Sequence, residues 1–182
     1  MNERHALIIG GTGMLADVSL WLTEMGYRVS VIGQTIEKHR QLRRKAKDPQ
    51  LLNSLAIDYS QLSVVETHIN KAMDENGPIS LVVSWTPDYR SLELVGRLVS
   101  ERIADWKLFH VKGSSRYLED DPIEIAANCQ YRSIYLGFII EGSQSRWLNH
   151  QEIACGVIHN IKKDNDVGIV GTLSPYEKRP GY

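Results

Sequence analysis

Apolar runs of strand length alternate with segments of helical periodicity along most of this chain. In the first example, Ala6–Ile9 is apolar throughout, and Met14–Met25 carries Leu15, Val18 and Leu22 on one helical stripe. Strands that are joined by helices lie parallel in one sheet, with helices on both faces. The sequence therefore predicts an α/β fold with a doubly wound, mainly parallel sheet in three layers, α/β/α.

The same patterns predict the individual elements. Strands are expected at Ala6–Ile9, Tyr27–Gly33, Leu55–Asp58, Pro78–Thr86, Lys107–Ser115, Tyr131–Ile140 and Val167–Leu173. Helices are expected at Met14–Met25, Thr35–Lys47, Gln61–Gly77, Ser91–Trp106 and Ser145–Lys163, with at most a short one at Pro122–Asn128. Asn149, followed three residues later by Glu152, resembles a helix-capping signal. A chain of 182 residues with 42% hydrophobic content supports one core, so we expect a single domain at 1–173 and a polar tail at 174–182.

A glycine-rich turn joins the first strand to its helix. Gly11–Ala16 fits the pattern G-x-G-x-x-G/A, whose glycines permit a tight turn and let main-chain N–H groups approach a pyrophosphate at the helix N-terminus. An ordinary glycine turn is the alternative, but the strand before it and the helix after it favour a phosphate site. The candidate binding residues are Gly10, Gly11, Thr12, Gly13, Met14 and Leu15.

The end of the second strand lacks the carboxylate that an NAD site usually places there. Gln34 and Thr35 occupy this position, and Lys38 follows on the next helix, with further basic residues at Arg40, Arg43 and Arg44. A missing carboxylate removes repulsion against a 2′-phosphate, and a cation can bind one. NADP is therefore the expected cofactor and NAD the less favoured one, although a solvated basic helix face would give the same pattern.

Two further strand ends supply candidate binding residues. Asp58 could accept a hydrogen bond from an adenine amine, with Tyr59 beside it, but a turn aspartate is an equal alternative. Ser84 and Trp85 fall where ligands collect, outside the carboxyl end of a parallel strand. A core tryptophan is the competing reading.

These landmarks together resemble the short-chain dehydrogenase/reductase superfamily. "GGTGMLA", "AIDYS" and "HVKGSS" are similar to its landmarks in order and spacing, most specifically over the first 115 residues or so. The resemblance implies a Rossmann fold with NAD(P) across the carboxyl edge of the sheet. It also implies that Ser114 or Ser115 orients a substrate carbonyl.

The proton donor of that family does not carry over. It is a tyrosine followed four residues later by a lysine on one helix, and no tyrosine in this sequence has a lysine at that position. Tyr117, close to Ser114 and Lys112, is the substitute candidate, with a surface tyrosine as its alternative. Two functions follow: an atypical oxidoreductase using NADP(H) on a carbonyl or alcohol, or a non-catalytic NADP(H)-binding sensor or scaffold. An S-adenosylmethionine site is a third alternative, which the missing carboxylate also disfavours.

Composition limits the other partners. The 21 basic and 22 acidic residues nearly cancel, which argues against nucleic acid or an anionic membrane. No apolar run approaches the roughly 20 residues that span a bilayer, so we expect a cytoplasmic protein. The scattered histidines and the two cysteines, Cys129 and Cys155, lack metal-site spacing, so no metal is assigned. An apolar final helix makes a homodimer plausible.

Overall fold

The computed structural model describes residues 3–119 and 122–181, which form a three-layer α/β/α structure. Seven parallel strands lie in the order β3-β2-β1-β4-β5-β6-β9. They are β1 (Arg4–Ile9), β2 (Tyr27–Ile32), β3 (Leu52–Leu55), β4 (Ile79–Ser84), β5 (Trp106–Gly113), β6 (Cys129–Leu136) and β9 (Val167–Val170). The strand order reverses between β1 and β4, because β2 and β3 lie on one side of β1 and the later strands lie on the other. Open α/β sheets bind ligands at such a point. The predicted doubly wound Rossmann architecture is confirmed.

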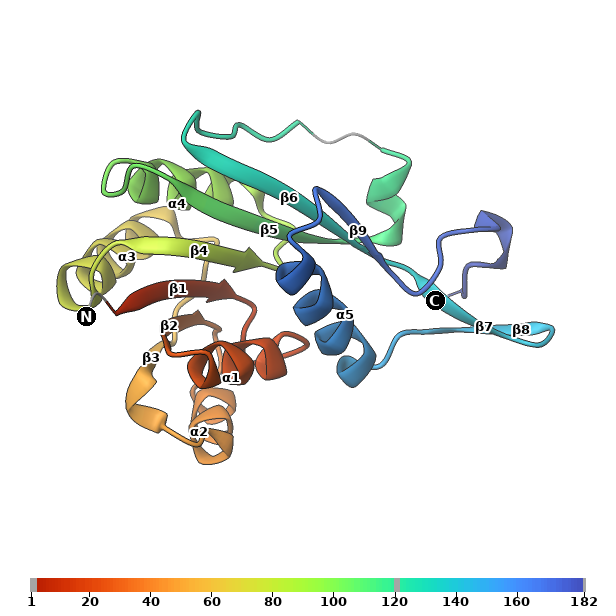
Figure 1. Cartoon of the computed structure of the whole chain (residues 1–182), viewed down its shortest axis with the longest axis horizontal. Coiled ribbons are helices and arrows are strands. Elements are labelled where there is room, and N and C mark those ends of the chain that lie inside the picture. Colours follow the sequence, from red (N-terminus) through yellow and green to blue (C-terminus); the bar gives the residue numbers. More distant parts are fainter. Residues whose placement is uncertain (1–2, 120–121, 182) are drawn as a thin grey trace.

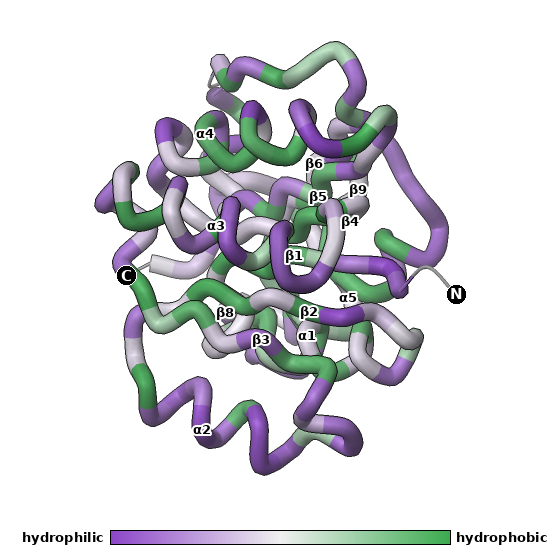
Figure 2. The backbone as a smooth tube through the Cα atoms, turned by 90° about the vertical axis from the view of Figure 1, so that its left-hand side faces the viewer, coloured by the Kyte–Doolittle hydropathy of each residue, from purple (hydrophilic) through white to green (hydrophobic). Residues whose placement is uncertain are grey.

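Five helices cover the two faces of the sheet (Figure 1). They are α1 (Ala16–Glu24), α2 (Ile36–Lys45), α3 (Leu62–Asn76), α4 (Tyr89–Ser100) and α5 (His150–Lys163). One core packs α1 and α5 against the sheet, and the other packs α3 and α4 against the opposite face. Because the central strands β1 and β4 are buried on both faces, they are apolar over most of their length, while α2 is largely hydrophilic (Figure 2).

Strand β3 lies three residues earlier than the sequence predicts. Its register aligns Leu52 with Val29 and Leu55 with Ile32 of β2, and the chain then turns, with the Ile57 amide donating to the Leu55 carbonyl. The prediction at Leu55–Asp58 followed the apolar residues, but Ile57 is buried in the core from outside the strand. Tertiary packing, not local pattern, sets this boundary.

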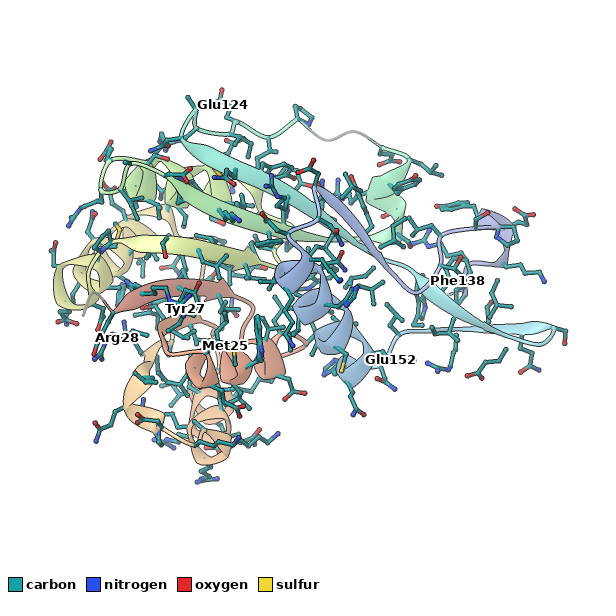
Figure 3. All side chains as sticks on the ribbon, viewed as in Figure 1. Met25, Tyr27, Arg28, Glu124, Phe138 and Glu152 are labelled. Carbon is teal, nitrogen blue, oxygen red and sulfur yellow. The ribbon has the colours of Figure 1, made fainter. Side chains whose placement is uncertain are left out.

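The predicted strand Tyr131–Ile140 is in fact two strands. β6 ends at Leu136, and Phe138–Glu141 forms β7, which pairs antiparallel with β8 (Gln144–Trp147) in a hairpin beyond the sheet. The hairpin extends from the carboxyl edge of the sheet (Figure 1). Its start is fixed by Phe138, which is fully buried and exchanges two main-chain hydrogen bonds with Thr172 (Phe138 is labelled in Figure 3).

The last helix is shorter than predicted because β8 takes its first residues. Asn149 is the N-cap, and its side chain accepts from the Glu152 amide while Glu152 accepts from the Asn149 amide. This capping box confirms the predicted signal. Similarly, the helix predicted to reach Trp106 ends at Ser100, and Trp106 begins β5.

No α-helix connects β5 to β6 within the described residues, where a short 3-10 helix at Ser114–Tyr117 follows β5. The predicted short helix at Pro122–Asn128 is wrong, because 122–126 are irregular. Asn128 lies in a turn, where its side-chain amide donates to the main-chain carbonyls of Ser100 and Ile103. The Glu124 amide donates to Glu93 of α4, which fastens the segment to the helix layer (Glu124 is labelled in Figure 3). None of the helices in the described ranges has the length and apolar character needed to cross a bilayer.

Candidate functional site at the carboxyl edge of the sheet

The glycine turn uses its three glycines for three different purposes. Gly10 has a φ of +83°, which favours glycine, and it lies against the carbonyl of Trp85. A Cβ on Gly11 would come within 2.6 Å of the Ser19 hydroxyl and 2.8 Å of Ile8, so this position must be glycine for packing. A Cβ on Gly13 would meet only the Gly10 carbonyl, 4.0 Å away, so this part of the turn is open.

The open side of the turn presents main-chain donors. No residue among those described accepts a hydrogen bond from the N–H groups of the half-buried Thr12 and Met14, or from that of Leu15, which is fully buried. Leu15 is the N-cap of α1, and no side chain caps that helix. Free donors at a helix N-terminus are suited to an anion, because the dipole and the hydrogen bonds act together.

A cavity of about 310 Å³ borders the turn at Met14. We call it the α5-side cavity, because Ile153 of α5 lines it together with residues that end β5 and β6. Trp147 of the hairpin and Arg179 of the tail close its outer side, and the Arg179 guanidinium lies 5.4 Å from the Trp147 ring centre. Its full lining is Met14, Trp85, Gly113, Ser114, Ser115, Leu136, Gly137, Trp147, Leu148, Ile153 and Arg179.

A second cavity of about 300 Å³ adjoins the first. We call it the α4-side cavity, because Tyr89 at the start of α4 lines it. The two cavities share Trp85, Gly113 and Ser115, so Ser115 faces both. The remaining lining residues are Thr86, Pro87, Val111, Lys112 and Arg116.

A polar cluster lies behind the α4-side cavity. His110 is 1% exposed and packs edge-on against the ring of Tyr89. Its Nδ1 and the Tyr131 hydroxyl share a hydrogen bond of 2.8 Å. Burial, and then repulsion from Lys112 and Arg116, lowers the pKa of His110 to about 3, so the ring is neutral at neutral pH. Lys112 lies 4.9 Å from the ring centre of Tyr135 and 5.5 Å from that of Tyr131.

The structure brings Gln34 and Asp58 together at the opposite end of the candidate site. Asp58 accepts hydrogen bonds from the amide and hydroxyl of Ser60, at 2.9 and 2.7 Å, and these bonds, with one from Gln34, lower its pKa. The Asp58 carboxylate therefore stabilises the turn that follows it, and its contact with adenine stays a prediction. Tyr59 packs against the α3 and α4 core. Thr35 is exposed at the N-terminus of α2.

Lys38 differs from the other three basic candidates on α2. Arg40 and Arg44 are within 3.6 and 3.8 Å of Glu37, and Arg43 donates to the Leu52 carbonyl. Lys38 is exposed and forms no ion pair with any described residue. It is therefore the candidate cation with no competing contact in the described chain.

The serines and the tyrosine after β5 occupy different environments. Ser114 is 4% exposed and lines only the α5-side cavity, whereas Ser115 borders both cavities. Tyr117 is 52% exposed, packs edge-on against Tyr135, and lines neither cavity. Ser84 is fully buried as the last residue of β4, so of the two candidates at this strand end only Trp85 lines the cavities.

The sequence alone did not indicate that Lys112 lies against Tyr131 and Tyr135. Lys112 is paired in register with Tyr135, and Leu108 with Tyr131, so the three polar side chains share one face of adjacent strands. A lysine near the end of an apolar strand was the available signal. Its partners depend on the register between β5 and β6, which no local pattern contains.

The residues around the turn fit a dinucleotide. The open amides and the space at Gly13 suit a pyrophosphate, and the α5-side cavity at Met14 leads from the turn to Ser115. Gln34, Thr35 and Lys38 lie after β2, where the adenosine ribose binds in this fold class. The described residues contain no group of three His, Cys, Asp or Glu side chains that could hold a metal ion.

Comparison with solved structures shows a close likeness of fold. No protein-family model matches the chain, and no curated protein matches it in sequence. A β-ketoacyl-[ACP] reductase from Bacteroides thetaiotaomicron superposes with a TM-score of 0.70 at 13% identity, over 93% of this chain and 97% of that one. A short-chain dehydrogenase/reductase described from Sinorhizobium meliloti 1021 gives 0.69 at 13%, over 96% and 98%.

A further match is a variant of the actinorhodin polyketide ketoreductase with NADPH. Its TM-score is 0.68 at 12% identity, over 94% of this chain and 97% of that one. At such identities the comparison establishes architecture alone. The chain has the Rossmann fold that these short-chain dehydrogenase/reductase structures share.

Proposed function

We propose that this protein is an NADP(H)-binding oxidoreductase that acts on a carbonyl or alcohol substrate. The observation that carries the proposal is the glycine turn, whose open amides border a cavity that reaches Ser115. The fold likeness to reductases, one of them with NADPH, supports it. Lys38 supports NADP over NAD, because it is a cation near the end of β2 that forms no ion pair with a described residue.

Each part of the site then has a role. The amides of Thr12 and Met14 hold the pyrophosphate, and Lys38 binds the 2′-phosphate. When bound, NADPH supplies hydride. Ser115 donates a hydrogen bond to the substrate carbonyl oxygen, and the neighbouring apolar lining of Met14, Leu136 and Leu148 limits access of water.

Thermal unfolding with separately titrated NADPH, NADH and S-adenosylmethionine tests the binding step. Ligand at about 100 times its dissociation constant stabilises a protein by about 2.7 kcal/mol. For this chain length we expect the midpoint to rise by roughly 5–10 °C with NADPH and by less with NADH. No rise with either nicotinamide cofactor would contradict the proposal, and a rise with S-adenosylmethionine alone would indicate the other nucleotide.

A non-catalytic NADP(H)-binding protein is the second candidate function. The irregular 122–126 segment favours it, because the described residues between β5 and β6 contain no α-helix that could hold a tyrosine over Ser115. Without a tuned acid, a carbonyl reduction loses about 10²–10⁴ in rate.

Turnover separates the two candidates. NADPH oxidation is followed at the cofactor's absorbance across a broad carbonyl panel, with Ser115→Ala as the test variant. The control is Ser143→Ala, at an exposed position in the hairpin turn. Activity that is lost in Ser115→Ala and kept in Ser143→Ala supports the oxidoreductase, whereas NADPH binding without turnover supports the sensor.

A further inference from the structure

We propose that the α4-side cavity binds an anionic group of the substrate, with Lys112 as its counter-ion, so that the substrate class is a carbonyl compound bearing a carboxylate or similar anion. This inference rests on the proposed function for the carbonyl half, while the anion site itself stands on the lining of the cavity. It is a specificity site, distinct from the glycine turn.

Among the described residues that line the cavity, the charged side chains are Lys112 and Arg116, and none is an aspartate or glutamate. Arg116 has interactions of its own, so Lys112 is the cation on which the inference rests. The histidine behind the cavity, His110, is neutral at physiological pH. A concave surface that is lined by an ammonium group attracts anionic ligands over neutral ones, because the field is focused in the cavity.

Lys112 is held in position without being neutralised. It is the second-last residue of β5 and is packed against the rings of Tyr131 and Tyr135, and no described carboxylate lies within ion-pair distance of it. Burial lowers its pKa, but hydrogen bonding and attraction to the two tyrosines outweigh burial and raise it overall. The ammonium is therefore charged and oriented before any ligand binds.

The Tyr89 hydroxyl is independent evidence that a polar ligand binds in the α4-side cavity. This hydroxyl is buried on the cavity wall and has no hydrogen-bond partner among the described residues, as is also true of His110 Nε2 and Ser84 Oγ behind it. Buried polar atoms normally find a partner, so three that gather here indicate a polar ligand or water. A carboxylate at Lys112 could accept from the Tyr89 hydroxyl with its second oxygen.

The position of the anion site relative to Ser115 selects the substrate. Ser115, Gly113 and Trp85 separate the two cavities, so a molecule that binds Lys112 extends toward Ser115 and the α5-side cavity. An anionic group and a reactive carbonyl a few bonds apart would satisfy both sites. Oxo acids are compounds of this kind.

Binding of phenylacetate and of the isosteric neutral phenylacetamide tests the anion site directly. Both are titrated calorimetrically into the full chain, with and without NADPH. One charge-assisted hydrogen bond contributes about 1.5–3 kcal/mol, so we expect phenylacetate to bind about 10–100-fold more tightly than phenylacetamide. Equal affinities in the wild-type protein would overturn the proposal without any variant.

Three variants locate the effect. Lys112→Gln should remove the preference for the anion and Lys112→Arg should keep most of it. Lys71→Gln, at an exposed position on α3, should leave it unchanged. A preference that survives in a folded Lys112→Gln protein would contradict the role of Lys112, and circular dichroism establishes the folding.

The same titrations separate this inference from the proposed function. If NADPH does not bind, but phenylacetate binds more tightly than phenylacetamide and this preference depends on Lys112, the anion site is supported and the dinucleotide site is contradicted. If NADPH binds but the two probes have equal affinity, the anion site falls alone. With both in place, phenylpyruvate should be reduced at least about tenfold more efficiently than its methyl ester.

Discussion

Single glycines in the first turn separate the requirements of folding from those of binding. Gly11→Ala places a methyl group against Ser19 and Ile8, and overpacking of this kind costs about 1–3 kcal/mol in the free energy of unfolding. Gly13→Ala places one in open space beside the free amides, so stability should change by less than about 0.5 kcal/mol while NADPH binding weakens.

Urea unfolding and the NADPH-induced midpoint shift measure the two effects. Gly11→Ala is thus the structural comparison for Gly13→Ala. A Gly13→Ala protein with the full NADPH shift would exclude the turn as the pyrophosphate site.

We expect Lys38 to set the preference for NADPH over NADH. Because its ammonium has no ion-pair partner among the described residues, Lys38→Ala should weaken NADPH binding about tenfold and leave NADH binding unchanged. Lys45→Ala, an exposed lysine at the far end of the same helix, is the matched control. Affinities from fluorescence titration test this, and an equal loss for both cofactors would argue against a 2′-phosphate contact.

The α5 capping box shows how one element is fixed by its neighbours. Asn149→Ala removes the side chain that accepts from the Glu152 amide at 2.8 Å, and loss of an N-cap costs about 1 kcal/mol. Gln151→Ala, exposed in the same turn, should have little effect. Equal stability of the two variants in urea would show that the cap contributes nothing.

The same box ties the hairpin to the helix. Arg146 of β8 donates to Glu152 at 2.8 Å, and this bond, with that from the Asn149 amide, lowers the pKa of Glu152 to about 2 (Glu152 is labelled in Figure 3). The carboxylate therefore stays charged down to low pH. The hairpin wall of the α5-side cavity is held at this helix terminus.

Because His110 is buried and neutral, we expect the free energy of unfolding of the whole molecule to decrease at acid pH. The folded pKa of His110, about 3, lies below the unfolded value of 6.5, so between these limits the unfolded chain binds the extra proton. Stability should therefore fall as the pH drops from 6.5 toward 3, by up to about 1.4 kcal/mol per pH unit for one histidine. His5, whose pKa burial also lowers, adds to the same trend.

Urea unfolding at pH 7, 6, 5 and 4 measures this dependence. His110→Gln should flatten part of the slope, and His159→Gln, an exposed position on α5, serves as control. A wild-type stability that is constant from pH 7 to pH 4 would contradict the burial of a neutral His110.

The α/β class, the parallel sheet, the glycine turn and the cap of α5 could all be predicted from the amino-acid sequence. These features depend on local residue patterns: strand and helix periodicity, glycine spacing, and an Asn and a Glu three residues apart. Such patterns act over a few residues, so they can be recognised without knowing the fold.

Three features could not be predicted in this way: where β3 and β6 end, that β8 replaces the start of the last helix, and that Lys112 contacts Tyr131 and Tyr135. Each depends on register or packing between segments that are distant in sequence. Lys112 and Tyr135 are 23 positions apart, and only the pairing of β5 with β6 makes them neighbours. The free energy that selects that register is spread over a buried sheet, and no short stretch of residues contains it.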